Sequence, residues 1–164
     1  MYKHLLFDWG NTLMVDKPEC LGPMYLWPSV DLCDGAAETL AMLCPHYKCH
    51  LASNAADSTE EEIRMALQRG GIDSFISEVF CYRSLGFEKP SKAYFSAILA
   101  RLNCEREEVL MIGDSWEKDI IGAQSSGIDA VWITPSETSR SDSAKVIHRL
   151  SDLPSVLTPQ GNSE

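Results

Sequence analysis

The chain has 164 residues, with 24 acidic and 14 basic side chains and a formal net charge of −10. This length predicts one domain, because domains commonly contain about 100–150 residues. The negative charge argues against binding to nucleic acid or to an anionic membrane surface, since both need basic patches.

Targeting signals and disulfide patterns are both missing from the sequence. No apolar run approaches the about 18 residues of a membrane-spanning helix, and the short apolar stretch before Asp8 does not have the pattern of a signal peptide. The six cysteines include no C-x-x-C pair. We therefore expect reduced thiols and a location in the cytoplasm.

The first predicted element is a short apolar strand that ends at a carboxylate. Leu5 to Phe7 are apolar, Asp8 follows them, and a polar turn with the sequence Trp-Gly-Asn-Thr comes next. An acid at the carboxyl end of a buried strand lies where open α/β sheets bind ligands. Asp8 is therefore the first candidate site residue.

The following segment contains Pro18, Pro23 and Pro28, which make a long helix there unfavourable. Apolar positions at helical spacing predict a helix over 36–43, which Pro45 ends. From residue 47 on, the chain alternates between strand and helix patterns. Its predicted elements are a strand over 47–52, a helix from about 58 to 70, a strand over 78–82, a helix over 91–102, a strand over 109–112, a helix over 116–126, a strand over 129–133 and a short helix over 144–151.

Strands that alternate with helices indicate βαβ units. We therefore predict an α/β fold with a doubly wound parallel sheet and helices on both faces. The domain is expected to cover 1–157, with a polar, mobile loop over 134–143 and a disordered tail over 158–164.

Three later segments also place polar residues at the end of a predicted strand or just before a predicted helix. They contain Ser53-Asn54, Lys89-Pro90 and Gly113-Asp114-Ser115, the last followed by Asp119. Together with Asp8-Trp-Gly-Asn-Thr12 and in this order, they resemble the four motifs of the haloacid dehalogenase superfamily of phosphoaspartate hydrolases. The resemblance covers residues 4–134 and implies a Rossmann-like core.

Members of this superfamily carry a cap domain at one of two insertion points. The chain has 45 positions from Asp8 to Ser53 and 36 from Ser53 to Lys89, and the predicted helices and strands fill most of both gaps. Only residues 14–34 remain, which is too few for a helical cap domain. The resemblance therefore implies a capless or minimally lidded enzyme that acts on a phosphorylated substrate, which can be large, and that can form a homo-oligomer.

The resemblance also implies a role for each motif residue. Asp8 would be the nucleophile that forms an aspartyl-phosphate, with Lys89 and Ser53 as the other catalytic residues. Mg²⁺ would be held by Asp8, the carbonyl of Gly10, Asp114 and Asp119, in keeping with its preference for oxygen ligands. The phosphate group would contact Ser53, Asn54, Lys89, Trp9 and Gly10, and Thr12 is a further supporting candidate.

One position departs from the pattern of the family's phosphatases. They place a second Asp two residues after the nucleophile, where it protonates the leaving group and then activates water, and this chain has Gly10 there. Glycine keeps the carbonyl that the metal would use but has no proton to transfer. General acid/base catalysis is typically worth about 10²–10⁴-fold, so we expect weakened turnover. Nothing in the sequence clearly replaces this acid; Asp16, which lies nearby in the sequence, is a disfavoured candidate for its role.

Two other functions remain open at this point. One is a non-catalytic module with the same fold that binds a phosphorylated ligand or a protein. The other is hydrolysis of a C–P or C–halogen bond, because superfamily members with that chemistry also lack the second Asp. The latter rely on caps to enclose small substrates, and the expected absence of a cap argues against it.

Overall fold

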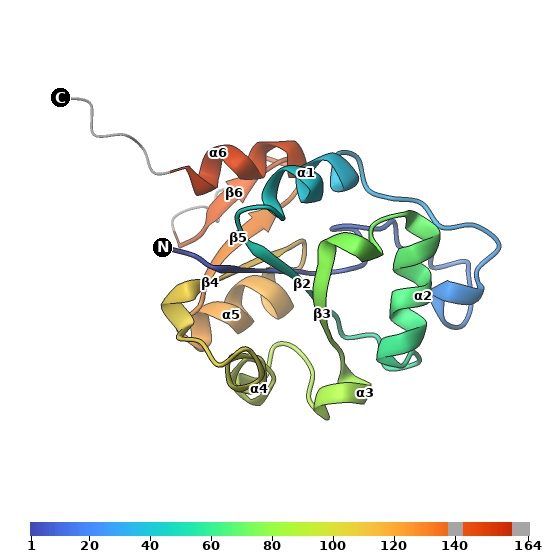
Figure 1. Ribbon diagram of the computed structural model, residues 1–164, viewed down its shortest axis with the longest axis horizontal. Coiled ribbons are helices and arrows are strands. Elements are labelled where there is room, and N and C mark those ends of the chain that lie inside the picture. Colours follow the sequence, from blue (N-terminus) through green and yellow to red (C-terminus); the bar gives the residue numbers. More distant parts are fainter. Residues whose placement is uncertain (138–142, 159–164) are drawn as a thin grey trace.

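The computed structural model describes residues 1–137 and 143–158. Their centre is a six-stranded, all-parallel sheet with the strand order β3-β2-β1-β4-β5-β6 (Figure 1). The strands are β1 (His4–Phe7), β2 (Lys48–Ala52), β3 (Ile76–Phe80), β4 (Val109–Gly113), β5 (Asp129–Ile133) and β6 (Lys145–Ile147). This confirms the predicted α/β fold.

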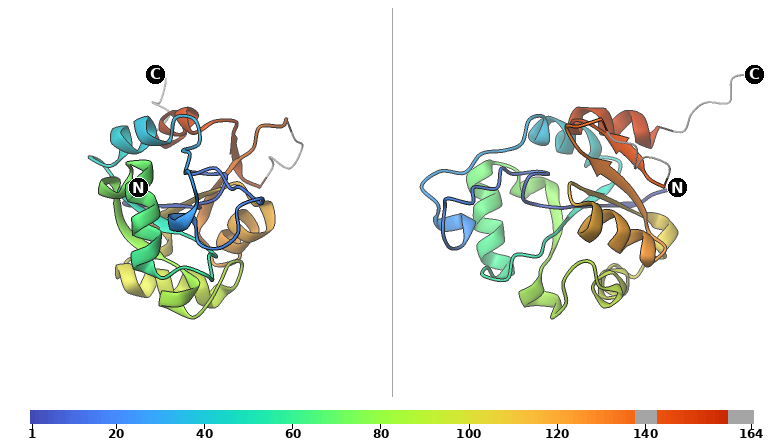
Figure 2. Two further views of the ribbon diagram at one scale, coloured as in Figure 1. Left: turned by 90° about the vertical axis from the view of Figure 1, so that its right-hand side faces the viewer. Right: turned by 180° about the vertical axis from the view of Figure 1, so that it is seen from behind.

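Helices cover both faces of the sheet, as the views in Figure 2 show. One face carries α1 (Ala36–Leu43), α2 (Glu60–Gly70) and α6 (Leu153–Leu157). The other carries α3 (Tyr82–Leu85), α4 (Lys92–Leu102) and α5 (Gly122–Ser125). Single turns at η1 (Met24–Leu26), η2 (Asp73–Phe75), η3 (Arg106–Glu108) and η6 (Leu150–Asp152) and a π-helix at η4 (Trp116–Ile121) complete the elements.

The sheet separates two hydrophobic cores because successive strand residues point to opposite faces. In β1, Leu5 and Phe7 pack with α1 and α2, whereas Leu6 packs with α4 and α5. All three side chains are fully buried. A strand buried on both faces is an uninterrupted apolar run, which is why residues 5–7 contain no polar position.

Capping residues fix where two of the long helices begin. Thr59 accepts a hydrogen bond from the backbone N–H of Glu62 at the start of α2, and Ser91 accepts one from that of Tyr94 at the start of α4. These side chains satisfy N–H groups that have no partner within the helix. The start of α4 in turn fixes the position of Lys89, two residues before the cap.

The strand order reverses at β1, and this reversal positions the site. The chain runs from β1 to β2 and β3 on one side, then crosses to β4, β5 and β6 on the other. The connections therefore diverge beyond the carboxyl ends of β1 and β4, which leaves a crevice there. Asp8 follows β1 directly and Asp114 follows β4 directly.

Three details differ from the sequence prediction. Residues 145–147, predicted as part of a helix over 144–151, form strand β6, which pairs with β5 and so extends the sheet. The prediction was wrong because this segment is short, and pairing with a sheet edge outweighs weak helical periodicity. The predicted strand over 78–82 begins at Ile76 and ends at Phe80, since Tyr82 already starts α3. The predicted helix over 116–126 is a π-helix followed by α5.

Residues 15–33 lie beyond the carboxyl ends of the strands, at the right of Figure 1. As predicted, they contain no long helix, and η1 packs against α2. Arg69 of α2 donates hydrogen bonds to the carbonyls of Tyr25 and Trp27, at 3.0 and 2.6 Å. Within 1–137 and 143–158 no separate cap domain covers the sheet, so this segment is the nearest feature to a lid.

The remaining sequence predictions concern the ends and the compartment. All six cysteines are free thiols. In the described part of the chain, no helix has the length and hydropathy needed to cross a membrane. Residues 138–142 of the predicted mobile loop and 159–164 of the predicted tail lie outside the described residues. The single-domain boundary at 157 stays a prediction.

Candidate active site

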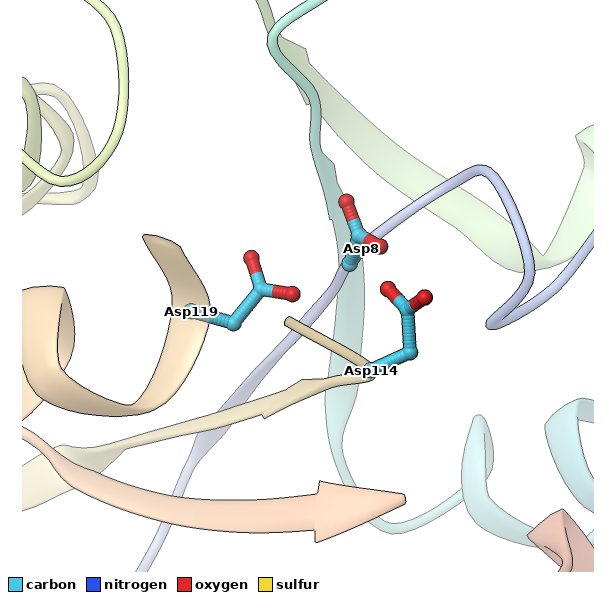
Figure 3. Close-up of side chains that lie close together, drawn as sticks. All are labelled: Asp8, Asp114 and Asp119. Carbon is cyan, nitrogen blue, oxygen red and sulfur yellow. The ribbon is translucent and has the colours of Figure 1, made fainter. Parts of the chain in front are cut away.

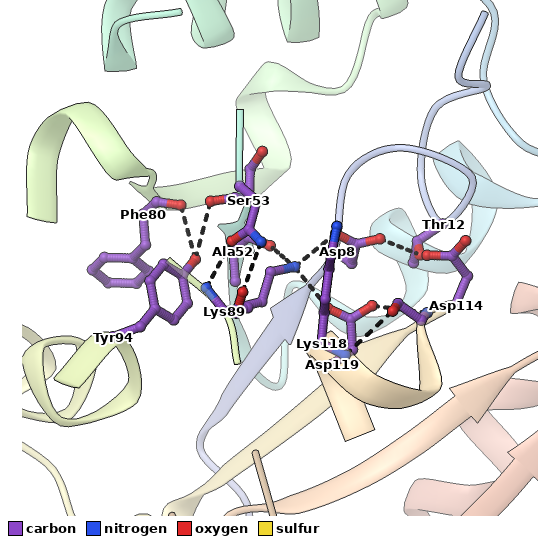
Figure 4. A network of polar contacts seen from close by, with 12 residues as sticks. Asp8, Thr12, Ala52, Ser53, Phe80, Lys89, Tyr94, Asp114, Lys118 and Asp119 are labelled. Atoms are coloured by element: carbon purple, nitrogen blue, oxygen red, sulfur yellow. Dashed lines mark hydrogen bonds and ion pairs between the residues drawn. The ribbon is translucent and has the colours of Figure 1, made fainter. Parts of the chain in front are cut away.

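Asp8 is the centre of a network of polar contacts at the carboxyl end of β1 (Figure 4). Its Oδ1 accepts a hydrogen bond from the Lys89 ammonium at 2.8 Å, and its Oδ2 accepts one from the hydroxyl of the buried Thr12 at 3.1 Å. Burial raises the pKa of Asp8, but the charge of Lys89 and hydrogen bonds to Asp114 and Lys89 outweigh this effect, so its pKa is below the ordinary value. The carboxylate is therefore ionised and oriented.

Lys89 is buried, with 3% of its surface exposed. Its ammonium donates to Asp8 Oδ1, to Asp119 Oδ1 at 2.7 Å and to the carbonyl of Ala52 at 2.8 Å, which uses all three of its protons. Burial alone would lower the pKa of Lys89, but Asp8 and Asp119 raise it above its ordinary value. Lys89 is thus a fixed positive charge between two carboxylates.

Asn54, at the end of β2, holds the backbone of Lys89 in place. Its side-chain N–H donates to the Lys89 carbonyl at 2.9 Å, and its side-chain oxygen accepts from the Lys89 N–H at 2.8 Å. This pair of bonds gives Asn54 a positioning role that the sequence did not reveal. The predicted contact between Asn54 and a phosphate group stays a prediction.

Ser53 lies at the end of β2 and is 3% exposed. Its Oγ accepts a hydrogen bond from the N–H of Ala55 at 3.0 Å, which leaves the hydroxyl proton available to a ligand. The Tyr94 hydroxyl below it lies 3.4 Å from the Ser53 carbonyl and 3.2 Å from the Phe80 carbonyl. Tyr94 is fully buried in the core, and these contacts show that it also supports Ser53.

Three carboxylates converge where β1, β4 and η4 meet, as Figure 3 shows. Asp8, Asp114 and Asp119 each offer an oxygen, and these oxygens all lie within 4.8 Å of one another. Burial and the neighbouring Asp8 raise the pKa of Asp114 to about 7. Burial also raises the pKa of Asp119, against the opposing effect of Lys89.

This charge balance suits a divalent cation. Three carboxylates face one ammonium, so the cluster has more negative than positive charge when all its acids are ionised. Burial is the largest cause of the raised pKa of Asp114, and the neighbouring carboxylates Asp8 and Asp119 raise it further, in keeping with this excess. Oxygen donors of this kind are what Mg²⁺ prefers, so the residues present fit the predicted metal.

The π-helix η4 brings Asp119 into the cluster. The N–H groups of Asp119 and Ile120 both donate to the carbonyl of Ser115, at 2.9 and 3.3 Å, which widens the first turn. Asp119 is fully buried, and its Oδ2 accepts the N–H of Ser115 at 3.0 Å. π-turns occur frequently at functional sites because they re-aim a side chain.

Gly113, the last residue of β4, leaves the space that the Asp119 carboxylate occupies. A Cβ atom on Gly113 would lie 2.2 Å from Asp119 Oδ2. We expect Gly113→Ala to lower the free energy of unfolding by about 1–3 kcal/mol, as overpacking does, and to weaken Mg²⁺ binding because Asp119 must move. Urea unfolding and magnesium titration check both effects.

Gly70→Ala is the matched control for that substitution. Its added Cβ would meet Leu32 and Met14 at 3.0 Å, but the atoms involved are the ends of flexible side chains. We expect a smaller loss of stability and no change in Mg²⁺ affinity. Equal effects of the two substitutions on Mg²⁺ binding would contradict the role assigned to Gly113.

A cavity of about 400 Å³ opens above the carboxylates. Its walls bring together all the residues predicted to be catalytic, to bind the phosphate group or to hold the metal: Asp8, Trp9, Gly10, Ser53, Asn54, Lys89, Asp114 and Asp119. The sequence did not identify Met24 and Trp27, which also line the cavity and come from the 15–33 segment. Trp9 is 5% exposed and donates to the sulfur of Met14, so packing accounts for most of its contacts.

The fold and site define an α/β protein with a doubly wound parallel sheet and a carboxylate cluster at the switch point of that sheet. Residues 26–133 match the family model of the haloacid dehalogenase-like hydrolases, and the chain belongs to that family. This match begins after Asp8 and Gly10. The family assignment confirms the resemblance seen in the sequence.

Individual relatives agree with this assignment. The chain is 31% identical to the putative HAD-hydrolase YfnB of Bacillus subtilis over 105 residues, which is 63% of this chain and 43% of that protein. It is 38% identical to a ribulose-1,5-bisphosphate 5-phosphatase of Halopiger xanaduensis over 44% of this chain and 30% of that protein. The aligned segment is therefore less than half of each relative's length.

Solved structures share the fold. A protein from Listeria monocytogenes of uncharacterized function superposes with a TM-score of 0.83 at 28% identity, covering 94% of this chain and 96% of that chain. The structure of YfnB bound to magnesium superposes with a TM-score of 0.78 at 19% identity, covering 96% of this chain and 99% of that chain.

Proposed function

We propose that this protein is a Mg²⁺-dependent phosphomonoester hydrolase that works through an aspartyl-phosphate on Asp8. The observation that carries the proposal is the convergence of three carboxylates and the buried Lys89 ammonium beneath one open cavity. In a site of this kind, a nucleophile, a fixed cation and oxygen ligands for a metal lie next to one another.

Asp8 would attack phosphorus with a carboxylate oxygen. A carboxylate is a weak nucleophile, so it must be ionised and aimed. Lys89 and Thr12 hold it by hydrogen bonds to its two oxygens, and its pKa below the ordinary value keeps it ionised at neutral pH. Ser53 would donate to a phosphoryl oxygen, as would the backbone N–H groups of Trp9 and Gly10.

Asp8, the carbonyl of Gly10, Asp114 and Asp119 would hold the metal. Bound Mg²⁺ neutralises charge on the phosphoryl oxygens and orients the phosphate group. Lys89 compensates the negative charge of Asp8 and Asp119 throughout, because its ammonium is bonded to both. Gly10 has no side chain, so proton transfer at this position is lost.

The relatives include phosphatases that act on small phosphorylated molecules, and this supports a phosphorylated substrate. A cavity of about 400 Å³ lies within the range of small-molecule sites, about 300–1,000 Å³. The earlier expectations of a large substrate and a homo-oligomer stay predictions. A location in the cytoplasm, in keeping with six free thiols, is also part of the proposal.

The decisive experiment measures phosphate release from a panel of phosphomonoesters with Mg²⁺ and with EDTA. We expect release with Mg²⁺ only, together with an increase in thermal stability. A ligand at 100 times its Kd stabilises a protein by about 2.7 kcal/mol. Calcium, which is larger and less strict in geometry, serves as the control for non-specific charge effects.

The same experiment separates the alternatives. Binding of Mg²⁺ and inorganic phosphate without any hydrolysis or trapped Asp8 adduct would instead favour a non-catalytic binding module. Release of halide or of a phosphonate carbon fragment, with phosphomonoesters inert, would favour C–halogen or C–P hydrolysis. Either result overturns the proposal.

A further inference from the structure

The proposed phosphatase reaction needs a proton donor that the residues described so far do not supply. An alkoxide is a poor leaving group, and a positioned acid that protonates it typically contributes about 10²–10⁴-fold. Gly10 carries no acid. The following inference concerns which residue takes this role, and it rests on the function proposed above.

Five carboxylates line the cavity, and three of them are engaged. Asp8 and Asp119 accept hydrogen bonds from Lys89, and Asp114 belongs to the same cluster as a metal ligand. The two that remain are Asp16 and Asp57. Both are exposed to solvent at the cavity wall.

The turn after Asp8 folds the chain back so that Asp16 lies beside Gly10. Asn11 adopts a left-handed conformation with φ of 59°, and its N–H donates to the Met14 carbonyl. The Asn11 side chain then accepts the N–H of Asp16 at 3.0 Å. A Cβ atom built on Gly10 would lie 3.4 Å from the Asp16 Cβ and 3.8 Å from its carboxyl carbon.

The Asp16 side chain thus lies next to the space that a side chain at position 10 would enter. Contacts with Asp31 also hold the two residues that flank Asp16 in the chain. The N–H of Val15 donates to the Asp31 carbonyl at 2.8 Å, and the Lys17 ammonium pairs with the Asp31 carboxylate at 2.7 Å. Among the residues that the structure describes, no cation forms an ion pair with Asp16, so its carboxylate is available.

We propose that Asp16 is the general acid and base of this hydrolase, in place of a residue at position 10. In the first step Asp8 forms a bond to phosphorus while the bond from phosphorus to the leaving oxygen breaks. The protonated Asp16 carboxyl group gives its proton to that oxygen. In the second step water attacks phosphorus and loses a proton to the Asp16 carboxylate, and the bond between Asp8 and phosphorus breaks. Phosphate is released, and both residues regain their starting states.

Asp57 is the matched control because it is an exposed acid on the same cavity. It lies after β2, and it accepts the hydroxyl of its neighbour Ser58 at 3.2 Å. Among the described residues, its side chain forms no hydrogen bond or ion pair with the turn that carries Gly10. Asp16→Asn and Asp57→Asn therefore make the same chemical change at two places on one cavity wall. Neither change removes the hydrogen bond from the backbone N–H of Asp16 to the Asn11 side chain.

The test compares two substrates, p-nitrophenyl phosphate and ethyl phosphate, with Mg²⁺ present. The nitrophenolate group leaves without a proton, whereas the ethoxide group needs one. We expect Asp16→Asn to lower kcat for ethyl phosphate by at least about 10²-fold, and to lower acyl-phosphate formation from p-nitrophenyl phosphate by less than threefold. Acid-quenched mass spectrometry should detect more phosphorylated Asp8 in the variant, because the second step also loses its base.

A second pair of variants tests the same role from position 10. Gly10→Asp alone puts two carboxylates side by side, and we expect at most a small gain. In the Asp16→Asn background, Gly10→Asp should restore much of the ethyl phosphate activity. Failure of this restoration, in a protein that still binds Mg²⁺, would count against the proposal.

Equal effects of Asp16→Asn and Asp57→Asn on ethyl phosphate would overturn the role of Asp16. The function proposed for Asp8 has a separate readout, which is the Asp8 adduct from p-nitrophenyl phosphate. An adduct in every Asp16 variant together with unchanged turnover of ethyl phosphate rejects only Asp16. No adduct in any protein, including the wild type, rejects the aspartyl-phosphate mechanism itself.

Discussion

Replacing Asp8 by Asn should abolish turnover of every phosphomonoester while the protein stays folded. Asn has nearly the same shape, but its amide cannot attack phosphorus. Removing the nucleophile of a covalent enzyme can cost as much as about 10⁶-fold in kcat, and we expect at least about 10⁴-fold here. Steady-state phosphate release and the mass of the acid-quenched protein measure this effect.

The stability of Asp8→Asn provides the control for folding. Asn keeps one oxygen that can accept from Lys89, its amide N–H can donate to the Thr12 hydroxyl oxygen, and Lys89 keeps the charge of Asp119, so the protein should stay folded with a small change in its thermal midpoint. Asp57→Asn, on the same cavity, should keep its activity. Phosphate release from Asp8→Asn at the rate of the wild type would show that Asp8 is not the nucleophile.

Replacing Lys89 by Met should destabilise the protein more than any other single change at the site. The Met side chain has similar length and no charge, so it leaves Asp119, which is fully buried, and Asp8 without their cation. Breaking a buried ion pair on one side typically costs about 3–5 kcal/mol. We expect this loss in urea unfolding at pH 8 with EDTA present, and we expect loss of activity.

The loss of stability caused by Lys89→Met should depend on pH, and the direction of this dependence follows from the pKa values of the groups involved. In the wild type, Lys89 has a raised pKa, so its contribution is full below its ordinary pKa and constant between pH 5 and 8. Without Lys89, burial and mutual repulsion raise the pKa of Asp8 and Asp119 above their unfolded values. The folded variant then binds more protons than its unfolded state, so its stability falls as pH rises.

The difference between wild type and Lys89→Met should therefore be smaller at pH 5 than at pH 8. Burial and the neighbouring Asp8 raise the pKa of Asp114 to about 7, so Asp114 titrates in both proteins and its interaction with Asp8 is part of the measured difference. Lys92→Met, an exposed lysine at the start of α4, is the matched control and should change stability by less than about 0.5 kcal/mol. A difference that does not vary with pH would contradict the ion-pair account.

Much of the site could be predicted from the sequence because it depends on where strands end. Asp8, Ser53 and Asp114 each directly follow a strand, and parallel strands bring their carboxyl ends to one edge. Lys89 was predicted through its motif. The wrong predictions concern short segments. Residues 145–147 are too few to show a clear hydrophobic periodicity, and they form a strand because they pair with β5 at the edge of the sheet.

The sequence by itself determined the family, the parallel sheet and the set of residues that gather at its carboxyl edge, because these follow from motif order and from the alternation of apolar segments. Only the tertiary structure decided how the side chains are used. In the structure, Asn54 forms hydrogen bonds with the backbone of Lys89, and the Lys89 ammonium lies between Asp8 and Asp119. Because Gly113 has no side chain, there is room for the carboxylate of Asp119.

The same holds for the missing proton donor. The sequence shows that position 10 has no acid and that an acid stands at position 16, six residues later, but it does not show where Asp16 lies in space. A left-handed residue and a few hydrogen bonds within the turn bring Asp16 back beside Gly10. Residue spacing cannot reveal this proximity, because it depends on the path of the backbone through the turn.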